Sequence, residues 1–166
     1  ILRYFNVGGA DDRERVGEGQ SVEPGGCRIV QIAAAGRGPA LQLFGTDFDT
    51  PDGTCVRDYV HVSDLVAGHL AALDYLDKGG DALVANLGTG RGHSTREVLA
   101  AVAEVTGRAV PWHAAPRRVG DPPALIADAR LAKSLLGFAP QRSELRTMLQ
   151  DAARAFGVLG QEVAHA

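Results

Sequence analysis

Cysteine is scarce in this chain, which has only Cys27 and Cys55 among its 166 residues. So sparse a pair does not form the disulfide framework of a small secreted domain, so we expect a reduced, cytoplasmic protein. No apolar run approaches the roughly 18 residues that a membrane-spanning helix requires, and no stretch has the pattern of a signal peptide. The formal net charge of −3 argues against nucleic acid or an anionic membrane as a partner.

The chain also lacks a tyrosine that is followed four residues later by a lysine. On one face of a helix, such a lysine lowers the pKa of the tyrosine, and the phenolate can then take a proton from a substrate hydroxyl. Here the positions four residues after the three tyrosines hold other residues: Gly8 after Tyr4, Ser63 after Tyr59 and Gly79 after Tyr75. We therefore predict no catalytic residue of this kind in the chain.

The order of the predicted elements indicates an α/β fold. Strand patterns cover residues 1–7, 41–44, 57–62, 82–87 and 109–113, and residues 8–26 predict a loop because they are rich in glycine and charge. A short buried helix is predicted over residues 27–35. Since residues 1–7 already form a strand whose neighbours must come from elsewhere, we interpret the chain as a fragment.

Four further helices are predicted from apolar stripes and capping residues. Ser63 or Asp64 caps the first, whose apolar side is Leu65, Val66, Leu70, Leu73 and Leu76. Ser94 and Glu97 form a capping box before the second, which carries Val98, Leu99, Val102 and Val105 and ends at Gly107. Asp128 caps a short helix that ends near Gly137, and Ser143 starts the last one, with Leu145, Met148, Leu149, Ala152 and Phe156.

Two motifs suggest ligands but fit them poorly. Gly88-Thr89-Gly90-Arg91-Gly92 is similar to a dinucleotide loop, yet His93 stands where the third glycine belongs and no acid follows at about 20 residues. The pattern therefore favours a glycine-rich turn. The acids from Asp47 to Asp58 resemble a calcium loop, but Asp52 occupies the position that requires glycine, so we predict polar turns and no metal site.

Arginines, aromatic residues and one acid form a candidate anion site. Arg57, Arg117 and Arg118 lie in segments otherwise poor in basic residues, and Gly120-Asp121 follows the arginine pair. An arginine fork matches phosphate oxygens with two parallel hydrogen bonds. Phe44 and Tyr59 are available to stack a base or contact a ribose. The alternative is that these arginines only solvate the surface.

The segments that carry these residues resemble one family. LRYFNV (residues 2–7), LFG (43–45), DGTCVRDYVHVSDLVAGH (52–69), NLGTGRGHS (86–94) and APRRVGDPPALIAD (115–128) are similar to UDP-glucose 4-epimerases, which are extended short-chain dehydrogenases. The similarity runs in order from residue 2 to about residue 156. It implies that the chain is the C-terminal, substrate-binding part of such an enzyme, that the Rossmann half is missing, and that NAD is held mainly by that half.

The resemblance also implies a domain organisation and a set of partners. Residues 1–157 would form the UDP-sugar-binding domain, with one or more strands that belong to the missing Rossmann sheet, and residues 158–166 a frayed tail. The implied partners are UDP-glucose and UDP-galactose, and the complete enzyme would be a homodimer. Leu125 stands where family members usually carry tyrosine or a smaller residue, which extends the implied substrates to UDP-N-acetylhexosamines.

Roles for individual residues follow from the same resemblance. Phe5 would lie beside the nicotinamide, and Asn6 would bond the phosphate or hexose of the substrate. The segment Leu41–Phe44, which includes Gln42, would line the uracil pocket, with Phe44 against the base or, alternatively, in the core. Arg57 and Arg118, with Tyr59, would clamp the pyrophosphate. Asp121 would accept hydrogen bonds from the ribose, and Leu125 would form a wall of the hexose pocket.

Two other interpretations stay open. The chain departs from the family at Gly25-Gly26-Cys27-Arg28, where an Asn-Leu or His-Leu pair and a proline usually touch the nucleotide. A dehydratase or decarboxylase of the same superfamily would share the motifs quoted above. A non-catalytic remnant that only binds a nucleotide sugar would share them as well.

Overall fold

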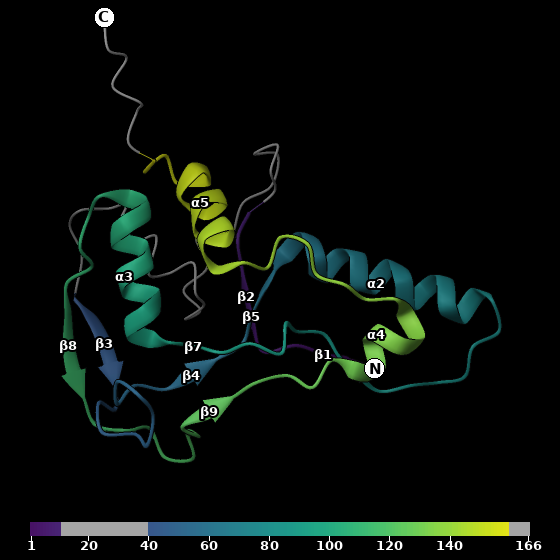
Figure 1. The fold of residues 1–166 in the computed structure, drawn as a ribbon, viewed down its shortest axis with the longest axis horizontal. Helices are drawn as coiled ribbons and strands as arrows, with labels where there is room; N and C mark the ends of the chain where they lie inside the picture. The colour runs from purple at the N-terminus through teal and green to yellow at the C-terminus, as the bar shows by residue number, and fades with distance from the viewer. Residues whose placement is uncertain (11–39, 160–166) are drawn as a thin grey trace, which may run out of the picture.

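The computed structural model describes residues 1–10 and 40–159, and the elements within them confirm an α/β fold (Figure 1). The strands are β1 (Leu2–Arg3), β2 (Asn6–Gly8), β3 (Leu41–Phe44), β4 (Val56–Arg57), β5 (Tyr59–His61), β6 (Ala85–Asn86), β7 (His93–Ser94), β8 (Trp112–Ala115) and β9 (Ala124–Leu125). The helices are α2 (Val62–Asp77), α3 (Thr95–Thr106), α4 (Arg130–Leu136) and α5 (Leu145–Ala155). The helix predicted over 27–35 lies outside the described residues.

The described strands form small sheets in which parallel pairing dominates. β1 pairs with β6, β2 with β5, and β3 with β8, all in parallel. β4 lies between β7, which is antiparallel to it, and β9, which is parallel. Residues far apart in the sequence are thereby brought together, because Arg57 faces Leu125 across β4 and β9.

Two hydrophobic cores lie on opposite sides of the described part of the molecule. Figure 1 shows α3, α5, β3 and β8 at one end and α2 with α4 at the other. The first core contains Leu43, Val98, Leu99, Val102, Val110, Leu145, Met148, Leu149, Ala152 and Ala153. The second contains Val60, Leu65, Ala85, Leu87, Ala132 and Phe138. The candidate site is carried by β3, β4 and the loop between β8 and β9.

Two predicted strands are each divided in the structure. Residues 1–7 form β1 and β2, because Leu2–Arg3 pair with β6 whereas Asn6–Gly8 pair with β5. Residues 57–62 are interrupted at Asp58, so that β4 joins β7 and β9 while β5 joins β2. A two-residue rhythm reports which side chains share a face, but it carries no information on a change of partner strand.

The helix caps differ from prediction at three of four N-termini. His61 caps α2 in place of Ser63 or Asp64, and Glu144 caps α5 in place of Ser143. Ala129 precedes α4 without a side-chain cap, although the Asp128 carboxylate accepts from the Arg130 amide at 3.1 Å. Asp64 binds the backbone amides of residues 141 and 142, both at 2.9 Å, and so holds a distant segment instead of its own helix.

The apolar side predicted for α2 is divided as well. Leu65 is buried in the second core, whereas Val66, Leu70, Leu73 and Leu76 are each at least 50% exposed. The stripe is real, but in the described residues nothing covers most of it. Within the same residues, no helix is long and apolar enough to cross a membrane.

The start of α3 is built as predicted and is reinforced by the loop before β4. Ser94 and Glu97 form the capping box, and Gly107 ends the helix in the left-handed conformation. Ser94 Oγ also donates to Asp52, whose other carboxylate oxygen accepts from the amide and the hydroxyl of Thr54. Burial alone would raise the pKa of Asp52, but these hydrogen bonds outweigh it and hold the pKa below its usual value. The Asp52-Gly53-Thr54 sequence thus braces the helix.

The last described residues pack against the rest of the structure. The amide of Val158 donates to the Ala153 carbonyl at 2.8 Å, and the side chain of Val158 is buried. Leu159 packs against the first core. The predicted tail of residues 158–166 therefore begins with packed residues, and positions 160–166 lie outside the described residues.

Candidate functional site

A tight turn places opposite charges side by side. The Asp121 amide donates to the Arg118 carbonyl at 3.2 Å, and Gly120, third in this turn, has φ of 82°. A positive φ at the third position defines a type II turn and favours glycine. The sequence Arg-Val-Gly-Asp therefore folds so that the side chains at its two ends can meet.

The carboxylate of Asp121 binds two arginines at once. Arg57 Nη2 donates to Oδ1 at 2.5 Å, and Arg118 Nε and Nη2 donate to Oδ2 at 3.0 and 2.8 Å. The side chains of Arg57 and Asp121 are each 11% exposed, whereas that of Arg118 is 55% exposed. We call these three residues, with Phe44, the arginine cluster.

The backbone anchors the inner arginine, and an aromatic ring supports the outer one. Arg57 Nη1 donates to the carbonyls of Val56 and Pro122 at 2.7 and 3.0 Å, which holds the guanidinium against the loop after Asp121. The Arg118 guanidinium carbon lies 5.1 Å from the centre of the Phe44 ring, within the range of a cation–π interaction. Arg118 is thus the more accessible of the two cations.

The neighbouring arginine is used differently. Arg117 lies over the Phe48 ring, with 4.4 Å from its guanidinium carbon to the ring centre, and its Nε donates to Asp47 at 2.7 Å. Consecutive arginines therefore stack on two different phenylalanines. Arg117 pairs with an exposed acid outside the arginine cluster.

The other predicted site residues lie at different positions around the cluster. Gln42 is exposed and shares one face of β3 with Phe44, because side chains alternate along a strand. Leu125 faces Arg57 across β4 and β9 and is 36% exposed. Asn6 Nδ2 donates to the carbonyl of Asp58 at 3.1 Å, between Arg57 and Tyr59. Phe5 is half-buried and lies in the short connection between β1 and β2.

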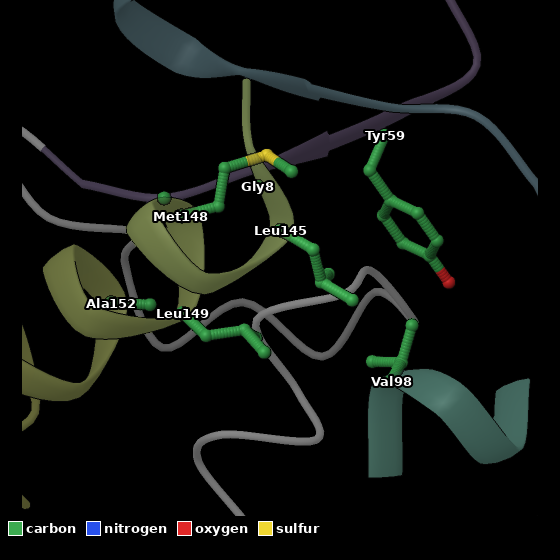
Figure 2. A pocket seen from close by; sticks show the side chains of 8 residues that line it. Gly8, Tyr59, Val98, Leu145, Met148, Leu149 and Ala152 are labelled. Atoms are coloured by element: carbon green, nitrogen blue, oxygen red, sulfur yellow. The ribbon is translucent and has the colours of Figure 1, made fainter. Parts of the chain in front are cut away.

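Tyr59 is built into the first core. Figure 2 shows its ring on the side of Val98 from α3 and Leu145 from α5, in a cavity that Gly8, Gly9, Met148, Leu149 and Ala152 complete. Burial raises the pKa of Tyr59 to about 12. Its hydroxyl therefore stays protonated at neutral pH, which is the opposite of what a catalytic phenolate needs. Its predicted help at the pyrophosphate stays a prediction.

The glycine-rich segment after β6 is held by a buried carboxylate. Asp58 Oδ2 accepts from the amides of Thr89, Gly90 and Ala127 at 3.1, 2.9 and 3.1 Å, and Oδ1 accepts from the Thr89 hydroxyl at 2.6 Å. A β-carbon on Gly88 would come within 2.8 Å of this carboxylate. The donors that a phosphate would need are taken by Asp58, so the segment is a structural turn, as its spacing predicts.

The acids that resembled a calcium loop have separate partners. Asp47 pairs with Arg117, Asp52 with Thr54 and Ser94, and Asp58 with the turn after β6. No group of three or more His, Cys, Asp or Glu side chains suited to a metal ion occurs in residues 1–10 and 40–159.

Sequence reasoning missed three buried polar groups that hold separate elements together. Asp58, His61 and Asp151 are almost fully buried polar residues, each with several hydrogen bonds. Asp58 and His61 stand in a segment whose rhythm is otherwise that of an apolar strand. A charged or titratable residue at a position predicted to be buried was the available signal, because such a group requires partners.

Fold and site together define an α/β domain that presents a partly exposed cation on an aromatic support. The NAD dependent epimerase/dehydratase family matches residues 1–88, and this chain belongs to that family. Its similarity to UDP-glucose 4-epimerases is confirmed by relatives. The UDP-glucose 4-epimerase of Azospirillum brasilense is 48% identical over 152 residues, which are 92% of this chain and 44% of the relative.

Solved structures give the same result. UDP-glucose 4-epimerase from Brucella ovis, in complex with NAD, has a TM-score of 0.88 and 47% identity, over 95% of this chain and 48% of that one. The UDP-Glc/GlcNAc 4-epimerase of Campylobacter jejuni has a TM-score of 0.76 and 40% identity, over 95% and 47%. The chain therefore spans about half the length of the relatives it matches, and it corresponds to their C-terminal part.

Proposed function

We propose that this chain is the UDP-sugar-binding part of a UDP-glucose 4-epimerase, which interconverts UDP-glucose and UDP-galactose. The observation that carries the proposal is the arginine cluster. It combines two guanidinium groups, one acid and one aromatic ring from four separate positions of the chain. Charge and planarity suit a diphosphate with an attached base, and the relatives act on substrates that contain both.

Each predicted residue then has a defined task. Arg118 and Arg57 contact the diphosphate, Asp121 accepts from the ribose hydroxyls, and Phe44 with Gln42 borders the base. Asn6 lies next to the Asp58 carbonyl, from where its amide reaches the hexose or its phosphate. The energy of binding the UDP group holds the sugar in position for chemistry performed by other groups.

This chain offers few residues that could hold NAD. The glycine-rich turn cannot accept a pyrophosphate, because Asp58 occupies its amides. Phe5 remains as a residue to lie beside the nicotinamide, so the cofactor is held mainly outside this chain. When bound, NAD would supply reversible hydride transfer at C4 of the hexose, with the hydroxyl proton moved by a base outside this chain.

The chain alone is expected to be inactive, because it contains no tyrosine with a lysine four residues later. The complete enzyme is expected to be a homodimer. Its substrates extend to UDP-N-acetylhexosamines, which the half-exposed Leu125 next to Arg57 supports.

A chimera tests the proposal directly. Residues 1–166 are joined to the N-terminal part of the Azospirillum brasilense enzyme, and conversion of UDP-galactose to UDP-glucose is measured by chromatography. We expect turnover by the chimera and none by either part alone. Arg118→Ala should lower UDP affinity about ten- to hundredfold, since a hydrogen bond to a charged group contributes roughly 1.5–3 kcal/mol.

The matched control is Arg117→Ala, which removes the adjacent cation but leaves the arginine cluster intact. A folded, NAD-loaded chimera that binds UDP without turnover would favour a non-catalytic remnant. Release of water from the hexose would identify a dehydratase, and release of carbon dioxide from UDP-glucuronic acid, offered as a second substrate, would identify a decarboxylase. Equal UDP affinity in the Arg118→Ala and unsubstituted chimeras would mean that the arginine is only surface charge.

A further inference from the structure

The Asp121 carboxylate already uses donors of both arginines that an anion could bind. Its two oxygens accept three hydrogen bonds from Arg57 and Arg118, at 2.5 to 3.0 Å. Arg57 Nη1 also donates hydrogen bonds to two backbone carbonyls. Any phosphate that approaches therefore meets guanidinium groups that already have a negative partner.

The turn makes this arrangement persistent. The Asp121 amide donates to the Arg118 carbonyl, and Gly120 between them has a positive φ, so the turn holds the two residues close together. The Asp121 side chain is 11% exposed and lies against the anchored Arg57, so it cannot move into solvent without breaking the inner ion pair. A bound anion must share the arginines with Asp121 and accept the repulsion of a like charge.

A carboxylate can accept about four hydrogen bonds, and three come from the arginines. A ligand that carries hydroxyl donors beside its phosphates can therefore supply the remaining one. The ribose of a nucleoside diphosphate has two hydroxyl donors that stay protonated at neutral pH, whereas inorganic pyrophosphate offers only an acidic O–H together with more negative charge. Asp121 thus weakens the binding of inorganic pyrophosphate and strengthens the binding of a nucleoside diphosphate.

We propose that Asp121 determines specificity by competing with anions for Arg57 and Arg118. The competition excludes inorganic phosphates and favours nucleoside diphosphates, whose ribose hydroxyls donate to the carboxylate. Specificity is a difference of affinities, and it can be set by weakening the wrong ligand as well as by strengthening the right one. The nucleoside part of this inference rests on the proposed function; the competition itself rests on the ion pairs alone.

The test compares inorganic pyrophosphate with UDP on the 166-residue chain by NMR titration at constant ionic strength. In Asp121→Asn the arginines lose their competitor, so pyrophosphate should bind about tenfold more tightly or better, while UDP gains less or weakens. The opposite-sign response is the signature, because a residue that only contacts ribose leaves pyrophosphate unchanged. Asp47→Asn removes an acid from the Asp47–Arg117 pair and controls for the general change in charge.

Asp121→Ser supplies a second neutral variant, so that the test does not depend on the folding of Asp121→Asn. Asp121→Glu keeps the charge and should keep pyrophosphate weak. Unchanged or weaker pyrophosphate binding in both neutral variants would overturn the proposal. If pyrophosphate binding strengthens but UDP binds no better than pyrophosphate to the unsubstituted chain, the competition stands and the proposed function fails.

Discussion

Leu125 lies at the border of the site, opposite Arg57 in the β4–β9 pair and 36% exposed. It has the size to form a pocket wall without the far edge and hydroxyl of a tyrosine ring. We therefore expect the complete enzyme to accept an N-acetyl group at C2 of the hexose. In Leu125→Tyr the ring should fill that space, and overpacking typically costs 1–3 kcal/mol.

The expected result is a selective fall in kcat/KM for UDP-N-acetylglucosamine, by about ten- to hundredfold, in the chimera described above. The kcat/KM for UDP-glucose should change little. Leu125→Met, which conserves volume, is the matched control. If both substrates fall together, or if neither changes, Leu125 does not form the wall of the hexose pocket.

At the scale of an element, the junction of β5 and α2 depends on a buried histidine. His61 Nδ1 accepts from the Ser63 amide at 3.0 Å, which caps α2 and places the ring proton on Nε2, 3.1 Å from Asp151. Arg142 and Arg154 also bind the Asp151 carboxylate, at 2.6 and 3.0 Å. A proton on Nδ1 would face the Ser63 N–H, so the fold requires the neutral ring.

Burial, despite the hydrogen bond to Asp151, lowers the pKa of His61 below its ordinary value of 6.5. The unfolded chain therefore binds a proton at about pH 6.5 that the folded chain does not. The free energy of unfolding should fall as the pH drops through 6.5 toward the lower pKa of the folded state. Urea unfolding at a series of pH values from 7.5 to 5 measures this slope.

His61→Asn keeps an acceptor for the Ser63 amide, since asparagine is a good N-cap, but has no charge to gain. Its free energy of unfolding should depend less on pH in this window than that of the unsubstituted chain. Parallel curves for the two proteins would show that another group causes the slope.

Local signals predicted some elements well. The bounds of β3 and both caps of α3 were predicted, because an apolar run, a capping box and a C-terminal glycine are encoded within a few neighbouring residues. The breaks at residues 4–5 and at Asp58 were not, since they arise from partner strands that are distant in sequence. In the candidate site, charge and residue type indicated Arg57, Arg117 and Arg118 alike, with Phe44 and Tyr59, and the ion pairs through Asp121 emerge only when the turn is folded.

At the scale of the whole molecule, most of the apolar face of α2 is exposed in the described residues. Parallel strand pairs such as β1–β6 and β2–β5 are normally covered on both faces in α/β proteins. Val66, Leu70 and Leu73 form an apolar surface next to them. Since the chain spans about half the length of its relatives, we propose that its strands continue into a larger sheet in the complete enzyme, and we expect the chimera to be active only if that sheet forms.

Asp58 joins three separate segments, because it lies between β4 and β5 and binds Gly90 after β6 and Ala127 after β9. In Asp58→Asn, an amide group faces N–H donors and leaves them unpaired, which should lower the free energy of unfolding by at least about 2 kcal/mol. Scanning calorimetry should show one transition in the unsubstituted chain and a lower melting temperature in the variant. Asp49→Asn, at an exposed position, is the control; two separate transitions before substitution would contradict this role.

The position of Asp58 next to Arg57 has a consequence for ligand binding. Ordering of the Arg57 guanidinium by a bound anion also restrains the peptide that joins it to Asp58, and through that carboxylate the turn at Thr89–Gly90 and the chain at Ala127. A ligand bound at the arginine cluster would in this way also restrain residues that it does not touch.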